Sequence, residues 1–323
     1  MIEPIKENLG VLVSQMRWEA IGVASLTLTL PSGAALPEWE PGAHIELTTP
    51  SGLIRQFTLC GDSRDLHSYT IAVRLEEYGR GGSAELHRTA LIGRELTISI
   101  PRNRFTLRDA AGYLFIAGGI GITPILTMAT AVQRRSVAPW QAIYTGRGVA
   151  TMAFSSQLQA LRPESVTILD TAAGPRIDLK DQICHLPEGS VVYCCGPAGL
   201  IAAVTEICST SSVQYEVERF HAEPAAPQMA GDSMDLSFVL ELRRSGLTVP
   251  VPPGVTVLQA VRDAGVSADF SCEEGYCGTC EVTVLEGTPD HRDTVLSTRE
   301  KAANTCMMAC VSRSCSDTLV IDL

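Results

Sequence analysis

The chain has 323 residues, of which 45% are hydrophobic and 19% charged, and its formal net charge is −11. This composition is typical of a folded globular protein and excludes a disordered chain. The negative charge argues against a nucleic-acid partner, which needs a concentrated basic face. No apolar run approaches the ~18 residues of a membrane span, and the first residues lack the apolar core of a signal peptide. We therefore expect a cytoplasmic protein without a membrane or nucleic-acid partner.

Short strand-like runs separated by Gly and Pro turns fill residues 1–110. Examples are SLTLTL, HIELTTP, YTIAVRL and ELTISI, and this pattern predicts a small antiparallel β-barrel. The run RQFTLC carries Arg55, Phe57 and Thr58, where an arginine can pair with a phosphate and a hydroxyl can reach a ring nitrogen. The run GRGGSAELH is a Gly-rich loop that leads into a helix, with Ser83 as the expected cap. Taken alone, these residues favour an ordinary barrel strand and turn over a binding site.

Strand and helix patterns alternate over residues 111–221, which predicts a parallel sheet flanked by helices. The turn GGIGITP (118–124) follows an apolar strand and opens a helix, so its backbone can approach a pyrophosphate. A second turn, YCCGP (193–197), places Cys195 at the carboxyl end of a strand, where α/β sheets bind ligands. We interpret Cys194 as a small buried hydrophobe. A Gly-rich turn alone is equally consistent with a purely structural role.

Residues 222–233 are rich in Pro, Ala and Gly and are predicted to form an interdomain linker. The remaining residues, 234–323, contain the stretch CEEGYCGTC. Its cysteines, Cys272, Cys277 and Cys280, have the C-x4-C-x2-C spacing of a plant-type ferredoxin, in which four thiolates bind a 2Fe–2S cluster. A zinc site is the alternative, but it prefers paired C-x2-C knuckles. The flanking strand and helix patterns fit a β-grasp ferredoxin fold.

Three later cysteines are candidates for the fourth thiolate: Cys306, Cys310 and Cys315. On one extended strand, Cys306 and Cys310 share a face but lie about 13 Å apart at ~3.3 Å per residue, so only one of them can reach the cluster. Cys315 has the opposite parity and follows a predicted turn. Spacing alone does not separate the first two.

The order of these motifs resembles that of the phthalate dioxygenase reductase family, a branch of the ferredoxin–NADP reductase superfamily. The shared elements are R-x-F-T, G-R-G-G-S, G-G-I-G-I-T-P, C-G-P and C-x4-C-x2-C, and they extend over nearly the whole chain. LEGTPDHRD and the ending LVIDL are similar to this branch in particular. The resemblance implies an FMN-binding β-barrel, a nucleotide-binding α/β domain and a 2Fe–2S ferredoxin domain.

The resemblance also implies roles for individual residues. Arg55 would bind the FMN phosphate, the hydroxyl of Thr58 would lie near the flavin N5, Phe220 would stack on the flavin and Cys195 would lie beside the nicotinamide. Thr58 and Cys195 are therefore the predicted catalytic residues. The stretch ACVSR matches the family's ligand-bearing strand, so the implied cluster ligands are Cys272, Cys277, Cys280 and Cys310. The residues expected to bind flavin or nucleotide are Arg55, Gln56, Phe57, Thr58, Ala72, Val73, Arg80, Gly81, Gly82, Ser83, Gly118, Gly119, Gly121, Thr123, Pro124, Arg147, Cys195, Gly196, Pro197 and Phe220.

Two residues depart from the family pattern. Phe57 stands where many relatives have Tyr, and Gly146 stands where relatives often have Ser or Cys. Only Arg147 is well placed to hold a 2′-phosphate, so we expect NADH rather than NADPH. The implied function is electron transfer from NADH through FMN and 2Fe–2S to a terminal Rieske non-haem iron oxygenase, because a flavin converts a two-electron donor into a one-electron donor. The alternatives are a reductase that serves a cytochrome P450 and a flavin-based redox sensor.

Overall fold

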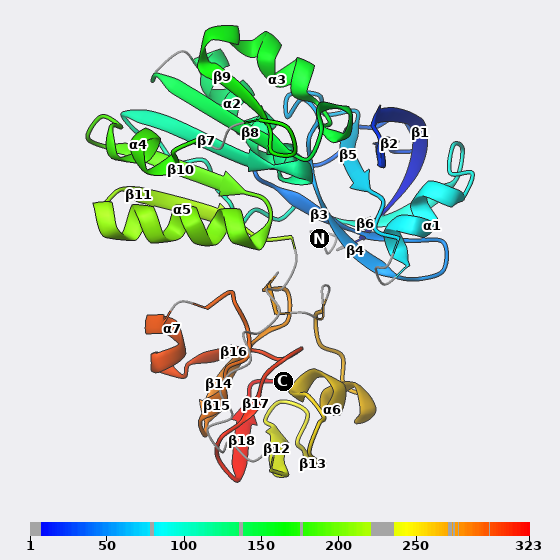
Figure 1. Ribbon diagram of the computed structural model, residues 1–323. Coiled ribbons are helices and arrows are strands. Elements are labelled where there is room, and N and C mark those ends of the chain that lie inside the picture. The colour runs from blue at the N-terminus through cyan, green and yellow to red at the C-terminus, as the bar shows by residue number, and fades with distance from the viewer. Residues whose placement is uncertain are drawn as a thin grey trace. The chain divides into compact units, whose positions relative to one another are not determined.

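The structure, a computed structural model, describes residues 8–77, 81–135, 138–174, 177–220, 236–270, 273, 275–276, 278–296 and 298–323. The chain divides into two compact units, Met1–Glu218 and Arg219–Leu323, shown in Figure 1. The predicted linker 222–233 lies outside the described residues, and the predicted domain limits stay a prediction. None of the helices in the described part of the chain is long and apolar enough to cross a membrane.

The first unit begins with a six-stranded antiparallel sheet in the order β4-β3-β6-β1-β2-β5. A bridge between Leu59 and Ile71 joins the end of β4 to β5, so the sheet closes into a barrel. Alternating apolar residues, such as Val11 and Val13, fill its interior, as the period-2 pattern of a strand requires. The elements are β1 (Asn8–Ala20), β2 (Val23–Thr29), β3 (His44–Thr48), β4 (Ile54–Thr58), β5 (Tyr69–Arg74), α1 (Gly82–Arg88) and β6 (Glu95–Ser99).

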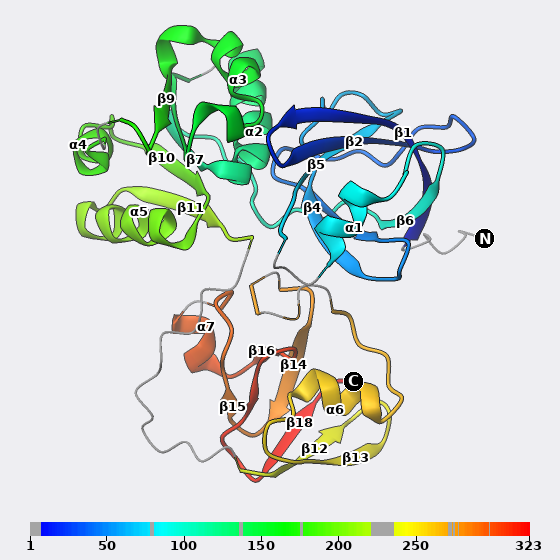
Figure 2. The same ribbon diagram turned by 45° about the vertical axis from the view of Figure 1, so that its right-hand side comes forward.

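The second part of this unit is a parallel sheet in the order β11-β10-β7-β8-β9. Figures 1 and 2 show α2 and α3 on one face of the sheet and α4 and α5 on the other. β7 is buried along its whole length, which explains its unbroken apolar run. The strands are β7 (Gly112–Gly118), β8 (Trp140–Gly146), β9 (Val166–Asp170), β10 (Ser190–Cys195) and β11 (Gln214–Glu218). The helices are η1 (Gly119–Gly121), α2 (Ile122–Arg135), η2 (Val149–Thr151), α3 (Ser155–Leu161), η3 (Pro163–Ser165), α4 (Leu179–Cys184) and α5 (Ala198–Ser211).

The second unit contains a mixed sheet in the order β13-β12-β18-β14-β16, in which only β12 and β18 run parallel. Helix α6 buries Val257, Leu258, Ala260 and Val261 in the core of this unit, as expected for a β-grasp fold. The elements are β12 (Phe238–Leu242), β13 (Leu247–Val251), α6 (Val257–Asp263), β14 (Glu281–Glu286), β15 (Pro289–Asp290), α7 (Thr298–Ala303), β16 (Cys306–Met308), β17 (Arg313–Ser314) and β18 (Thr318–Ile321).

One expectation about this sheet is wrong. Cys306 and Cys310 do not lie on one extended strand, because β16 ends at Met308 and Cys310 stands in the turn that follows. The backbone N–H of Ala309 donates to the carbonyl oxygen of Cys280 at 3.0 Å, which draws this turn toward the end of the cysteine loop.

Candidate functional site

The two barrel motifs meet at the start of α1, although they are far apart in the sequence. Arg55 projects from β4, and its Nη1 donates to the carbonyl oxygen of Ile54 at 2.7 Å. A Cβ atom on Gly82 would lie only 2.8 Å from Cγ and Nε of Arg55, so only glycine allows this approach. The left-handed φ of 85° at Gly81 also requires glycine. A guanidinium beside a Gly-rich turn is a suitable cradle for a terminal phosphate.

Ser83 does not cap this helix, so that expectation is wrong. The N-cap of α1 is Gly81, and Ser83 lies inside the helix. Its Oγ instead accepts a hydrogen bond from the backbone N–H of Glu76 at 3.0 Å, which joins the helix to the segment that follows β5.

The seam that closes the barrel contains four of the predicted flavin-binding residues. The Leu59–Ile71 bridge brings the end of β4, with Phe57 and Thr58, alongside β5, with Ala72 and Val73. Phe57 is half-buried and packs against the barrel core, whereas the other three residues are buried. The carbonyl oxygen of Val73 also lies 2.9 Å from Nε2 of His87 in α1, which ties the seam to that helix.

The two predicted nucleotide-binding turns are in direct contact at the carboxyl edge of the parallel sheet. β7 and β10 are neighbours, with Ala117 paired to Cys195. A Cβ atom on Gly121 would lie 2.2 Å from the backbone oxygen of Cys195, and a Cβ atom on Gly196 would lie 2.9 Å from Cα of Gly118. The glycines of both motifs are therefore required for the close approach of the two turns.

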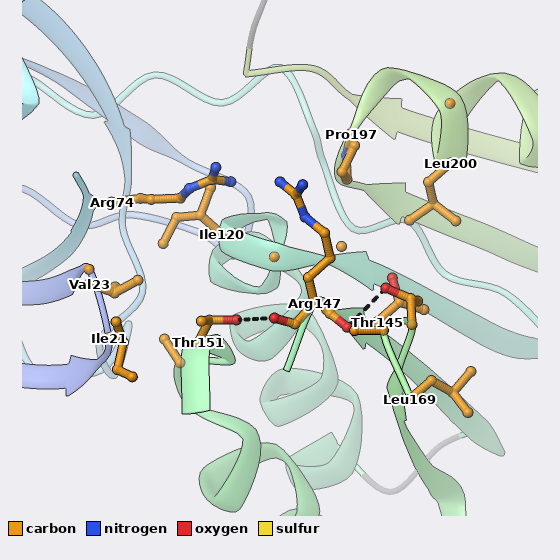
Figure 3. A pocket seen from close by; sticks show the side chains of 18 of the residues that line it. Ile21, Val23, Arg74, Ile120, Thr145, Arg147, Thr151, Leu169, Pro197 and Leu200 are labelled. Atoms are coloured by element: carbon orange, nitrogen blue, oxygen red, sulfur yellow. Dashed lines mark hydrogen bonds between the residues drawn. The ribbon is translucent and has the colours of Figure 1, made fainter. Parts of the chain in front are cut away.

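A pocket of about 950 Å³ opens beside these turns. Its lining includes Gly118, Gly119, Arg147 and Pro197, which were predicted to bind the cofactors, and Arg74, which was not. Arg74 stands at the carboxyl end of β5, and Arg147 stands in the turn after β8. Figure 3 shows the guanidinium groups of both arginines directed into the same part of the pocket. Two guanidinium groups complement the phosphates of a dinucleotide. The position of Arg74 at the end of the strand YTIAVRL is the signal that sequence reasoning missed.

Several residues around the turns have defined partners. The hydroxyl of Tyr144 donates to the carbonyl oxygen of Gly119 at 3.1 Å, and Oγ1 of Thr123 donates to that of Ile120 at 3.1 Å. Arg74 pairs with Glu76 at 3.1 Å. These contacts fix the turn between β7 and α2 and the position of one pocket arginine.

Cys195 is fully buried at the end of β10 and is not part of the pocket lining. Burial raises the pKa of its thiol well above the usual value, and Glu218 and Cys194 add to this. The thiol is therefore protonated at neutral pH and is not a nucleophile. Glu218, which sequence reasoning missed, lies opposite Cys195 on the neighbouring strand β11. Burial raises the pKa of its carboxyl group to about 7, and the positive charge of Arg104 opposes this shift.

Two of the residues predicted to bind flavin or nucleotide are not placed at either of these sites. Arg80 is outside the described residues. Phe220 is half-buried and belongs to the second compact unit, so its stacking on the flavin stays a prediction.

The second unit brings two of the predicted cluster ligands together. Cys280 and Cys310 are buried, and the backbone N–H of Cys310 donates to Sγ of Cys280 at 3.4 Å. Backbone N–H groups directed at sulfur are typical of iron–sulfur sites. The loop has left-handed φ angles at Gly275 (73°) and Gly278 (75°), which let its backbone fold closely. These residues fit a 2Fe–2S cluster, whereas Cys272 and Cys277 lie outside the described residues and stay predicted ligands.

Comparison with known proteins gives consistent matches along the chain. Residues 240–315 match the 2Fe-2S iron-sulfur cluster binding domain. The chain is 36% identical to the phenoxybenzoate dioxygenase subunit beta of Ectopseudomonas oleovorans, covering 98% of this chain and 97% of the relative. The crystal structure of phthalate dioxygenase reductase, described as modular for electron transfer from pyridine nucleotides to [2Fe-2S], is 33% identical over 98% of both chains with a TM-score of 0.74. The chain belongs to the phthalate dioxygenase reductase family.

Membership of the phthalate dioxygenase reductase family confirms the predicted fold class: an antiparallel β-barrel, a parallel α/β sheet and a β-grasp ferredoxin domain. The protein is an oxidoreductase, the reductase component of an oxygenase system, and its cofactors are FMN, a 2Fe–2S cluster and NADH. The chain also matches an intact type IV self-sufficient cytochrome P450 monooxygenase, with 38% identity and a TM-score of 0.85 over all of this chain. It spans 43% of that longer protein.

Proposed function

We propose that this protein is the reductase of a Rieske non-haem iron oxygenase and delivers electrons from NADH to that separate protein. The likeness to the phenoxybenzoate dioxygenase subunit over nearly the full length of both chains is the observation that supports this partner best. We also propose a cytoplasmic location, where NADH is available.

In this proposal the barrel residues hold the flavin. Arg55 would pair with the FMN phosphate, and Gly81 and Gly82 would bring backbone N–H groups close to it. The absence of a side chain at Gly82 lets the turn lie against Arg55, since a Cβ atom there would collide with that arginine. The seam between β4 and β5 would hold the flavin ring, and Thr58 would supply a hydroxyl group that can hydrogen-bond to it. Once bound, the flavin accepts a hydride and passes on single electrons.

The pocket residues orient the nicotinamide nucleotide. The glycine turns after β7 and β10 would let the dinucleotide backbone approach the sheet edge, and Arg74 would pair with its pyrophosphate, while Arg147 lies in the same pocket. Cys195 and Thr123 are buried at these turns, and in this proposal Cys195 would lie beside the nicotinamide and Thr123 near the flavin. NADH is preferred over NADPH, since Arg147 is the one predicted contact for a 2′-phosphate. Arg147→Ala should therefore raise the ratio of kcat/KM for NADH to that for NADPH; an unchanged ratio would show that Arg147 does not contact that phosphate.

The partner is tested by presenting two acceptors to the same preparation. Anaerobic reduction by NADH and this protein is followed for a purified Rieske oxygenase, through the EPR signal of its Rieske centre, and for a cytochrome P450, through its carbon monoxide difference spectrum. Saturable, fast reduction of the Rieske oxygenase is expected. Reduction of that oxygenase no faster than by free flavin and NADH would exclude this class of partner.

A cytochrome P450 is the second candidate partner. The 38% identity over the whole of this chain to the reductase portion of a self-sufficient P450 favours it. In the experiment above, faster reduction of the P450 than of the Rieske oxygenase supports this second assignment.

A further inference from the structure

The stretch DHRDT (290–294) connects the two halves of the cluster-binding region. The backbone N–H and the hydroxyl of Thr294 both donate to the carbonyl oxygen of Gly275, at 2.9 and 3.3 Å. On the other side, the backbone N–H of Arg292 donates to Oγ of Ser312 at 3.2 Å. Gly275 lies in the cysteine loop, and Ser312 lies just past the fourth predicted ligand. This stretch therefore sets the separation of the loop from the turn that carries that ligand.

A buried carboxylate lies at the centre of the stretch. Asp293 is 4% exposed, and its Oδ2 accepts hydrogen bonds from the backbone N–H groups of Val295 and Leu296, at 3.1 and 2.8 Å. Nζ of Lys301 lies 3.8 Å from the same oxygen and donates to the carbonyl oxygen of Asp293. An ionised carboxylate away from water is costly unless it is paired and hydrogen-bonded. These partners therefore fix both the carboxylate and the backbone that leads to Thr294.

The other carboxylate oxygen is left without a hydrogen bond. Oδ1 of Asp293 faces Nδ1 of His291 at 3.8 Å, and neither atom has a hydrogen-bond partner among the described residues. The histidine is itself held by Nε2, which lies 3.3 Å from Oδ1 of Asn304, directly after α7. Figures 1 and 2 show α7 beside β16, the strand that leads to the fourth predicted ligand. Unsatisfied buried polar atoms are rare in native structures, so this pair calls for an explanation, such as a role in redox chemistry.

We propose that Asp293 is a positioning residue for the 2Fe–2S centre. With Lys301 and His291 it holds the cysteine loop against the Cys310 turn, and its buried negative charge lowers the reduction potential of the cluster. The loop backbone packs directly against Asp293, because a Cβ atom on Gly275 would lie 3.2 Å from Cα of Asp293. A fixed anion beside an anionic cluster disfavours the reduced form, which carries one more negative charge.

Two substitutions in the full-length holoenzyme separate the charge from the hydrogen bonds. Asp293→Asn keeps an oxygen that accepts from Val295 and Leu296 but removes the charge. We expect this variant to bind the cluster as the parent protein does and to show a more positive cluster potential in an EPR-monitored redox titration. Asp293→Ala removes both features, so we expect faster bleaching of the cluster by an iron chelator. Its flavin should still be reduced by NADH at the parent rate.

The control is Asp317→Asn, which removes an exposed carboxylate from the same unit and should leave the potential unchanged. Lys301→Met provides an opposite test, because it removes the cation and leaves the charge of Asp293, so the potential should become more negative. If the Asp293→Ala variant does not fold, the cluster potential of Lys301→Met still tests the proposal. A potential in Asp293→Asn equal to that of the Asp317→Asn control would overturn the proposal, as would a shift of the same sign in Lys301→Met.

Discussion

Gly121→Ala tests whether the contact between the two glycine turns forms the nucleotide site. The added methyl carbon would lie 2.2 Å from the backbone oxygen of Cys195 and 2.8 Å from the backbone nitrogen of Gly196. Comfortable contacts between non-bonded carbons are about 3.5 to 4.0 Å, and neither backbone atom can rotate away. The two turns must therefore separate by roughly 1 Å, and overpacking of this kind costs roughly 2 to 3 kcal/mol. For a cooperative unit of the size of Met1–Glu218, that corresponds to a decrease of roughly 4 to 12 °C in Tm.

The assay combines thermal unfolding with anaerobic reduction of the flavin by NADH. We expect Gly121→Ala to keep its flavin, because the barrel is untouched, and to raise KM for NADH at least tenfold. Gly199→Ala is the matched control for Tm, since its added methyl has no neighbour within 4 Å and alanine favours the helix by about 0.5 to 1 kcal/mol. Because Gly199 lines the pocket, this variant is not used as a control for KM. If Gly121→Ala had the Tm and the KM of the parent protein, the two turns would not meet as described.

Three further predictions address the flavin, the cluster and the pH dependence of stability. Arg55→Ala should purify largely without flavin, and denaturing the parent protein should release FMN; released FAD would contradict the single-phosphate cradle. Cys310→Ser should lose the visible iron–sulfur absorption while NADH still reduces the flavin, and Cys306→Ser should keep both, so the opposite pattern would exchange the two assignments. Burial, assisted by Arg104, lowers the pKa of His44 from 6.5 to about 4. Because the unfolded chain binds this proton and the folded chain does not, acidification from pH 8 to 5 should remove about 2 kcal/mol of unfolding free energy. His44→Asn should flatten this slope in denaturant titrations, and an unchanged slope would refute the assignment.

Local sequence patterns were sufficient for most of the fold. The alternation in β1 and β2, the unbroken apolar run of β7 and the glycines of its following turn are each determined within a few residues, so they can be predicted from the sequence. The short helix α4 was missed, because its six residues contain only one buried side chain, Ile183. Its start is nevertheless marked by Asp178, whose side chain accepts from two backbone N–H groups.

The parts of the site that sequence reasoning missed depend on contacts between distant segments. Arg74 belongs to the pocket because the end of β5 lies beside the turn after β7, and no local pattern specifies that contact. Ser83 was expected to cap α1 because serine is a common cap, but the left-handed Gly81 takes that position. Cys310 was placed on a strand by counting residues, whereas hydrogen bonds to Cys280 turn the chain there.

The most direct test of electron transfer through this protein is a single anaerobic turnover followed by stopped-flow absorbance. One equivalent of NADH is mixed with the holoenzyme, and the flavin and iron–sulfur bands are recorded together. The flavin band should bleach first and the iron–sulfur band should follow, and Cys310→Ser should show the first phase alone. Bleaching of the iron–sulfur band before the flavin band, or in flavin-free Arg55→Ala protein, would contradict the sequence of electron transfer from NADH through FMN to the cluster.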